Sequence, residues 1–116
     1  MASERNAREI VLSCVEALNR DDYKVARQYL SDDLSFDGVL GCRRGADAYL
    51  LDIKRMRPRC TVKKAFSDGD DVCLLYDLAI AETTIFVCGW FQVKLGKIRS
   101  LRVIFDPRAL LQAKAA

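Results

Sequence analysis

Carboxyl and thiol groups are the side chains of this sequence that could carry chemistry, because its 116 residues include no histidine. Without an imidazole, histidine-based zinc sites, serine–histidine and cysteine–histidine nucleophile pairs and imidazole bases are excluded. Three aspartates lie in or beside apolar segments and are the candidate acids: Asp37, Asp52 and Asp77. We predict no metal site and no cofactor.

The five cysteines fit small apolar side chains better than a disulfide framework. Their number is odd, no two have Cys-x-x-Cys spacing, and three lie inside apolar stretches. A cytosolic chain of this size needs no covalent staples, so we expect free thiols at all five positions: Cys14, Cys42, Cys60, Cys73 and Cys88.

Composition and charge predict one domain with an ordinary surface. Apolar residues make up 51% of the chain and the net charge is +3, which does not by itself indicate nucleic acid. The basic stretch 54–64 lacks interleaved aromatics, so we interpret it as a solvated face. No apolar run reaches the ~20 residues of a membrane span, and the charged start "MASERNAREI" is unlike a signal peptide. We expect a cytoplasmic protein.

Apolar spacing predicts helices first and strands later. Steps of three and four residues indicate a helix over 7–18, a second to about Leu30 and a third over 46–56. "LSFDG" (34–38) is a short strand. Four longer strands rich in β-branched and aromatic residues follow: "TVKKAF", "VCLLYDLAI", "TTIFVCGWFQV" and "IRSLRVIF". The break at "AETT" (81–84) lacks Gly and Pro, so its boundary is uncertain. This order indicates an α+β fold, with a loosely attached tail from about residue 108.

The order of these elements resembles the nuclear transport factor two-like superfamily, which includes ketosteroid isomerases and SnoaL-like cyclases. The segments that carry the likeness are 17–41, 43–53 and 96–107. The resemblance implies one domain over 1–116: a conical α+β barrel whose three N-terminal helices pack in the concave face of a strongly curved, mostly antiparallel sheet. A cavity would open at one end of the cone.

The same resemblance argues against the two best-known chemistries of that superfamily. In the isomerases it implies a tyrosine donor, an aspartate base and a protonated aspartic acid. Those positions fall on Cys14, Gly38 and, approximately, Gly89. The cyclases imply a histidine–aspartate pair, which this sequence cannot supply. The two glycines would instead enlarge the cavity, unless Trp90, Phe91 and their neighbours fill the space.

The register implied by the resemblance defines an almost wholly apolar candidate site, with Asp77 as its acid. Burial among apolar side chains would raise the pKa of Asp77 and fit it to proton transfer. A one-residue slip would instead put Asp77 outside and Tyr76 inside, and Asp77 could also be structural. Asp37 then points outward, Asp52 could close the site with Tyr49 from the third helix, and Cys73 and Ala79 face inward. The predicted ligand-binding residues are Cys14, Leu18, Phe36, Gly38, Tyr49, Leu75, Asp77, Val87, Gly89, Phe91, Leu101, Val103 and Phe105.

Two functions from different classes follow. The first is a protein that binds an apolar small molecule, with an isomerase- or cyclase-type reaction through Asp77 as its enzymatic form. The second is a non-catalytic association domain with a filled core. We also expect a homodimer, because the convex face of the sheet would expose Phe86, Cys88, Trp90 and Ile104. The competing arrangement is a monomer in which "RALLQ" folds back over that patch.

Overall fold

The N-terminal helices are set by local signals that the sequence displays. The structure, a computed structural model, describes residues 6–115. Helix α1 (Ala7–Asn19) begins at a capping box in which the Asn6 side chain accepts from the Glu9 N–H at 2.8 Å and the Glu9 carboxylate accepts from the Asn6 N–H. Helix α2 (Tyr23–Gln28) has only six residues, and α3 (Ala46–Met56) has eleven. Of the three predicted N-terminal helices, α1 and α3 are therefore long, and α2 is little more than one turn.

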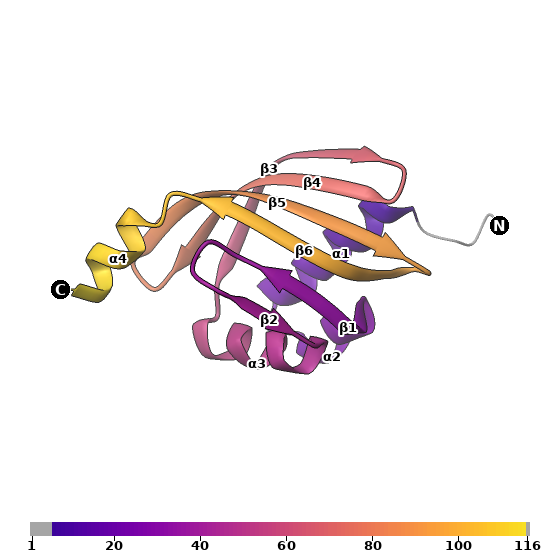
Figure 1. Cartoon of the computed structure of the whole chain (residues 1–116), viewed down its shortest axis with the longest axis horizontal. Coiled ribbons are helices and arrows are strands. Elements are labelled where there is room, and N and C mark those ends of the chain that lie inside the picture. The colour runs from indigo at the N-terminus through magenta and orange to yellow at the C-terminus, as the bar shows by residue number, and fades with distance from the viewer. Residues whose placement is uncertain (1–5, 116) are drawn as a thin grey trace.

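The strands form one six-stranded mixed sheet in the order β2-β1-β6-β5-β4-β3. Neighbouring strands are antiparallel except β1 and β6, which run parallel. The four long strands make the predicted meander, so the α+β class is confirmed. The strands are β1 (Leu30–Asp37), β2 (Cys42–Arg44), β3 (Arg59–Asp68), β4 (Asp71–Ile80), β5 (Thr83–Lys94) and β6 (Lys97–Phe105) (Figure 1).

The predicted conical barrel with a strongly curved sheet is wrong. The sheet is open, and its edge strands β2 and β3 do not pair with each other among the described residues. One edge, β2, has only three residues, all exposed. A strand this short offers few backbone N–H and C=O groups that could pair with β3 and close the sheet into a barrel.

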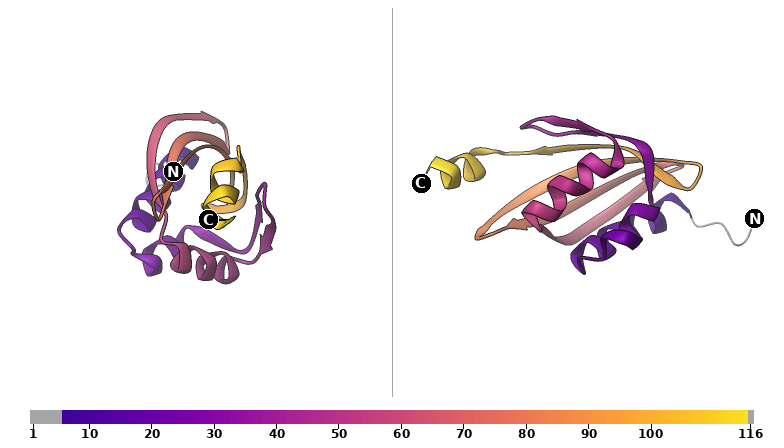
Figure 2. Two further views of the ribbon diagram at one scale, coloured as in Figure 1. Left: turned by 90° about the vertical axis from the view of Figure 1, so that its left-hand side faces the viewer. Right: turned by 90° about the horizontal axis from the view of Figure 1, so that it is seen from below.

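Helices α1 and α3 lie across one face of the sheet, which we call the inner face (Figure 2). From α1, Ile10, Val11 and Cys14 are buried against it, and Leu50 and Ile53 are buried from α3. In the part of the chain that the structure describes, no helix crosses the centre of the opposite face, which we call the outer face. The core is therefore a single layer between two helices and one face of the sheet, and the site must lie there.

The C-terminal segment is a helix, α4 (Arg108–Ala115), which contacts β5 and lies beyond the end of the sheet (Figure 1). The Asp106 side chain accepts from the N–H of Arg108 at 3.0 Å, so an aspartate cap followed by proline starts the helix. Within residues 6–115 the structure has no helix long and apolar enough to cross a membrane.

Candidate functional site

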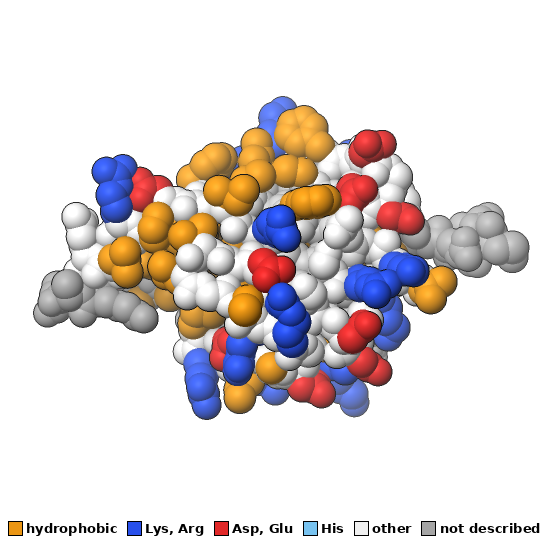
Figure 3. All heavy atoms as spheres, viewed as in Figure 1, with side chains coloured by type: hydrophobic (Ala, Val, Ile, Leu, Met, Phe, Trp, Pro, Cys, Tyr) orange, Lys and Arg blue, Asp and Glu red, His pale blue; other side chains and the backbone are white. Residues whose placement is uncertain are grey.

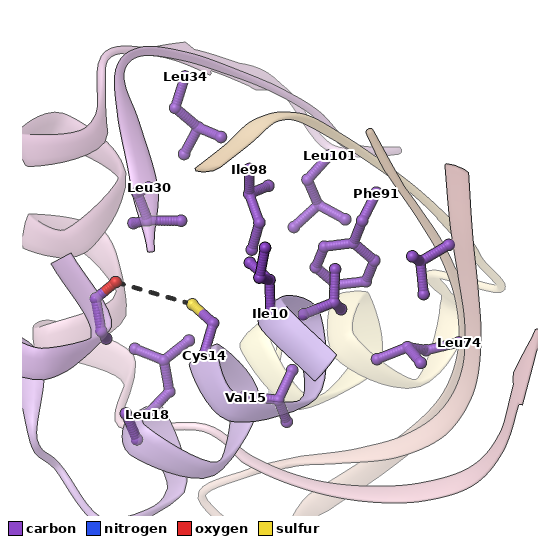
Figure 4. Packing of buried hydrophobic residues seen from close by; sticks show 14 of the residues in the cluster. Ile10, Cys14, Val15, Leu18, Leu30, Leu34, Leu74, Phe91, Ile98 and Leu101 are labelled. Atoms are coloured by element: carbon purple, nitrogen blue, oxygen red, sulfur yellow. Dashed lines mark hydrogen bonds between the residues drawn. The ribbon is translucent and has the colours of Figure 1, made fainter. Parts of the chain in front are cut away.

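A small cavity of about 40 Å³ lies between α1, α3 and the inner face of the sheet. In Figure 4, Cys14 and its neighbours on α1 lie opposite Phe91, Ile98 and Leu101 of the sheet. A space of this size is large enough for water but far smaller than the ~150 Å³ cavity that holds benzene. The wall consists of Cys14, Val15, Leu18, Leu30, Leu34, Tyr49, Cys60, Tyr76, Phe91, Ile98 and Leu101.

Five of the predicted ligand-binding residues lie in this wall: Cys14, Leu18, Tyr49, Phe91 and Leu101. The others on the inner face pack elsewhere in the core or at its margin: Phe36, Val87, Gly89, Val103 and Phe105. Gly38 follows the end of β1. The sequence analysis missed six wall residues: Val15, Leu30, Leu34, Cys60, Tyr76 and Ile98. Helical spacing was the signal for Cys14 and Leu18, and Val15 could have been found in the same way because it lies four residues after Val11.

The inward position predicted for Asp77 is wrong, because β4 is shifted by one residue from the expected register. Val72, Leu74 and Tyr76 are buried on the inner face. Leu75, Asp77, Cys73 and Ala79 alternate with them and point to the outer face. The Asp77 carboxylate lies 3.4 Å from the Lys63 ammonium and its side chain is 37% exposed. Asp77 is therefore a surface ion-pair partner, and the alternative slip described above is the observed one.

Aromatic rings fill the space that the two glycines were expected to open. A Cβ added at Gly89 would lie 3.2 Å from the rings of both Tyr76 and Phe91 and 3.3 Å from the Tyr76 hydroxyl oxygen. A Cβ at Gly38 would lie 3.1 Å from the Phe36 ring. The glycines thus make room for neighbouring rings, and the prediction of an enlarged cavity there is wrong.

Tyr49 and Tyr76 are the wall residues that carry a hydroxyl group. Burial raises the pKa of both phenols well above the usual value, so both are protonated at neutral pH and can donate a hydrogen bond. The Tyr49 ring packs on Phe36 with the ring centroids 5.3 Å apart. Both of those side chains are partly exposed, and Phe36 lies beside the wall rather than in it.

Two thiols also line the cavity, and neither is activated. Burial, with a smaller contribution from Cys60, raises the pKa of Cys14 to about 12. Burial raises the pKa of Cys60 to about 11. A nucleophilic cysteine requires a lowered pKa. Cys14 instead donates to the carbonyl of Ala26 at 3.8 Å, the dashed line in Figure 4.

A polar clamp fixes α1 and α3 against strand β3 at the end of the cavity. The Asn19 side chain accepts from the backbone N–H of Cys60 and donates to the carbonyl of Cys60, both at 2.8 Å. The Asp21 carboxylate accepts from Arg57 at 2.9 Å and Arg59 at 2.8 Å. Hydrogen bonds from these two arginines and from Tyr23 hold the pKa of Asp21 far below its usual range. Part of the basic stretch 54–64 therefore has a structural role.

The two remaining candidate acids are ion-pair partners on the surface. Asp37 points outward, as expected, and accepts from Arg44 at 3.2 Å. Asp52 on α3 accepts from Arg43 on β2 at 2.7 Å. Neither lines the cavity, so its described wall carries neither a carboxylate nor an imidazole.

The outer face carries the exposed apolar patch that the sequence predicted. Phe86, Trp90 and Ile104 are 57%, 43% and 64% exposed, and Cys88 is half-buried between them. A shallow groove of about 680 Å³ separates this patch from α4. Apolar side chains gather over α4 and the adjoining sheet in Figure 3. Helix α4 leaves the patch open, so it does not fold back over it.

Comparison with known proteins identifies relatives over most of the chain. Residues 11–101 match the model of the SnoaL-like domain. A nuclear transport factor two-like protein of unknown function from Cytophaga hutchinsonii is 36% identical, with 96% of this chain and 99% of that chain covered and a TM-score of 0.92. An LEH-like epoxide hydrolase from M. tuberculosis is 25% identical over 91% of this chain and 86% of its own, with a TM-score of 0.80.

A more distant likeness supports the fold alone. A nuclear transport factor two-like protein of unknown function from Burkholderia pseudomallei is 16% identical, covers 97% of this chain and 99% of its own, and has a TM-score of 0.83. No curated protein gives a significant match to the sequence.

Proposed function

Because the chain belongs to the SnoaL-like domain family, we propose that it binds a small, mostly apolar molecule carrying one hydrogen-bond acceptor. The ligand would lie between α1, α3 and the inner face of the sheet. One observation supports the proposal: two tyrosines that are protonated at neutral pH, Tyr49 and Tyr76, belong to a wall that is otherwise apolar or thiol. Binding sites of this kind combine apolar walls with a few placed polar groups.

The chemistry of the wall favours binding over proton transfer. A phenol with a raised pKa donates to a carbonyl, ether or hydroxyl oxygen but is a poor acid near pH 7. The relative from M. tuberculosis is an epoxide hydrolase, and an epoxide is a compact molecule with one acceptor oxygen. Hydrolysis needs a base to activate water, and the described wall supplies none. The shared feature would be the shape of the ligand rather than the reaction.

Ligand entry requires the wall to move. A cavity of about 40 Å³ is far smaller than the ~150 Å³ that benzene occupies in an engineered cavity. The Tyr49 ring, which is partly exposed and packs on Phe36 beside the wall, would be the element that swings outward. Its movement would join the cavity to solvent and leave the Tyr76 hydroxyl at the base.

Paired ligands test this function. Cyclohexanone and methylenecyclohexane have similar shape but only the ketone accepts a hydrogen bond. We expect the ketone to bind more tightly by titration calorimetry, and expect Tyr76→Phe to remove most of that preference while leaving the hydrocarbon affinity unchanged. Leu51→Phe, on the exposed side of α3, is the matched control. Equal preference in wild type and Tyr76→Phe would contradict the assigned role of the hydroxyl.

The second candidate function is association through a domain with a filled core. The observation that favours it is the small cavity together with the rings that occupy the space at Gly89 and Gly38. If no member of a panel of apolar ketones, ethers and alcohols shifts the thermal midpoint at millimolar concentration, this second function replaces the first.

We also propose that the chain forms a homodimer through the outer face. Phe86, Trp90 and Ile104 present a contiguous exposed apolar surface, which is typical of an association site. Arg102, whose guanidinium carbon lies 6.0 Å from the centre of the Trp90 ring, would make the contact partly polar. Sedimentation of a 13.1 kDa particle at micromolar concentration would contradict this dimer.

The pairing of β4 with β5 suggests a sharper variant than a change at Trp90. Trp90 donates to the Asp71 carboxylate at 2.9 Å, so an acid placed there would meet a like charge. Phe86 lies directly opposite Asp77, so the ammonium of Phe86→Lys has an acid beside it in the monomer. We expect Phe86→Lys to be monomeric and folded, and Leu51→Lys on α3 to behave as wild type.

A further inference from the structure

We propose that Cys73 and Cys88 form a two-thiolate binding site for a thiophilic metal or metalloid centre on the outer face. The two cysteines lie on the central strands β4 and β5, and their sulfur atoms are 3.5 Å apart. Both are free and half-buried. The cavity on the inner face does not include them, so this site is separate from the proposed ligand site.

The strand register places the two thiols diagonally rather than directly opposite. Cys73 pairs with Trp90, and Cys88 pairs with Leu75. The Cα atoms of diagonal neighbours are about 7–8 Å apart, whereas a disulfide requires Cβ atoms about 3.8 Å apart and sulfurs at about 2.05 Å. Because β4 and β5 are hydrogen-bonded to strands on both sides, a disulfide would need one strand to slide against its neighbours.

A bridging centre requires no such movement. At the usual zinc–thiolate length of about 2.3 Å, sulfurs 3.5 Å apart subtend an angle of roughly 100° at a shared centre. That angle suits pyramidal and near-tetrahedral thiolate coordination. The 3.5 Å distance between the two sulfur atoms is too long for a disulfide, but it suits two thiolates that bind one shared atom.

The surroundings define the class of centre. Thiolates select soft ions, and the described residues hold no group of three or more Cys, Asp or Glu ligands that would complete a protein-only metal site. The remaining ligands must come from outside, as in a trivalent arsenical with one organic substituent. Trp90 lies directly opposite Cys73 and offers an apolar surface to that substituent.

The reaction with such a centre balances without an oxidant or reductant. An arsenoxide, R–As=O, reacts with the two thiols to form two As–S bonds. The two S–H protons leave with the arsenoxide oxygen as one water molecule, and arsenic remains trivalent throughout.

Phenylarsine oxide tests the site by intact mass spectrometry. We expect wild type to retain one equivalent in the presence of excess mercaptoethanol and to release it to dimercaptopropanol. We expect Cys73→Ser and Cys88→Ser each to lose this retention. Cys42→Ser, which removes a lone exposed thiol on β2, should retain it. Full retention by either Cys73→Ser or Cys88→Ser would overturn the assignment, as would release of the wild-type adduct by mercaptoethanol.

A second measurement uses the unmutated protein and so does not depend on folding of the variants. Prior treatment with phenylarsine oxide should protect Cys73 and Cys88 from iodoacetamide while Cys42 is alkylated. Alkylation of Cys73 and Cys88 at the untreated rate in both wild type and Phe86→Lys would overturn the proposal. The same experiment on Phe86→Lys ensures that a dimer through the outer face does not hide the pair, and protection in either chain supports the site.

Discussion

Filling the cavity at Cys14 should stabilise the protein. Cys14→Val replaces the sulfur with one methyl group and adds a second beside a cavity of about 40 Å³. At about 24 cal/mol per Å³, complete filling of the cavity is worth ~1 kcal/mol. The independent value for one added buried methyl group is about 0.8 kcal/mol. The two values agree, so we expect the free energy of unfolding to rise by roughly 0.5–1 kcal/mol.

The costs of this substitution are small. Valine and cysteine have similar helix propensities. The lost hydrogen bond from Cys14 to the Ala26 carbonyl is long, at 3.8 Å, and that carbonyl also accepts from the N–H of Tyr29 at 3.0 Å. No buried acceptor is left unpaired, which is the situation that makes such losses expensive.

Urea unfolding at pH 7 measures the effect, with two companion variants. Cys42→Val makes the same chemical change on exposed β2 and should alter stability by less than about 0.5 kcal/mol. Cys14→Ser puts a hydroxyl in the apolar wall and should destabilise by about 1–3 kcal/mol. If Cys14→Val destabilises by more than about 1 kcal/mol, the wall has no room for a methyl group and the reasoning fails. Cys14→Val should also weaken binding of the ketone proposed above.

Three further outcomes follow from the structure. Leu34→Ala, at a side chain only 1% exposed, should cost about 2–5 kcal/mol in urea unfolding; a cost below 1 kcal/mol would show a loosely packed core. Asp77→Ala breaks an exposed ion pair and should cost less than about 1 kcal/mol without changing ketone affinity; loss of binding would return Asp77 to the site. Asp21 has a lowered pKa, so its contribution is complete above about pH 4 and is lost as the pH falls toward the folded-state value. The stability gap between wild type and Asp21→Asn should therefore be smaller at pH 3 than at pH 7, and an equal gap would contradict this.

The elements with clear local signals were predictable from the sequence. The helix at 7–18 is confirmed because its apolar spacing has one solution. The strands of the meander are confirmed because runs of β-branched and aromatic residues mark them. The helix α4 was missed although its start signal, Asp106 followed by Pro107, was present. The sequence of this short segment does not reveal whether the folded protein offers a surface on which a helix could pack. The open form of the sheet was not predictable either. Whether the sheet can close depends on the length of the edge strand β2, which has only three residues.

The residues of the cavity were predictable only where a helical stripe or an unambiguous strand phase identified them. The phase of β5 was right, because Val87 and Phe91 face inward on either side of Gly89. The phase of β6 was right at Leu101 and Val103. Ile98 was missed because an irregularity in the β5–β6 ladder shifts the register near it. Leu30 was missed because the sequence analysis placed it at the end of the second helix, whereas it is the first residue of β1.

The error at Asp77 has a single cause, which is the position of one hairpin turn. "VCLLYDLAI" is apolar at consecutive positions, so alternation alone leaves both phases of β4 open. The hairpin resolves the choice. Ala81 and Glu82 form a two-residue turn, with Ile80 opposite Thr83.

Counting from that turn puts Tyr76 opposite Val87 and Leu74 opposite Gly89, and residues directly opposite each other share a face. An inward Val87 therefore requires an inward Tyr76. The turn was hard to locate because Ala81 adopts the left-handed conformation, with φ of 55°, which usually calls for Gly or Asn. One unmarked turn thus decides whether the cavity contains a carboxylate or a phenol, and so whether its chemistry is proton transfer or hydrogen-bond donation.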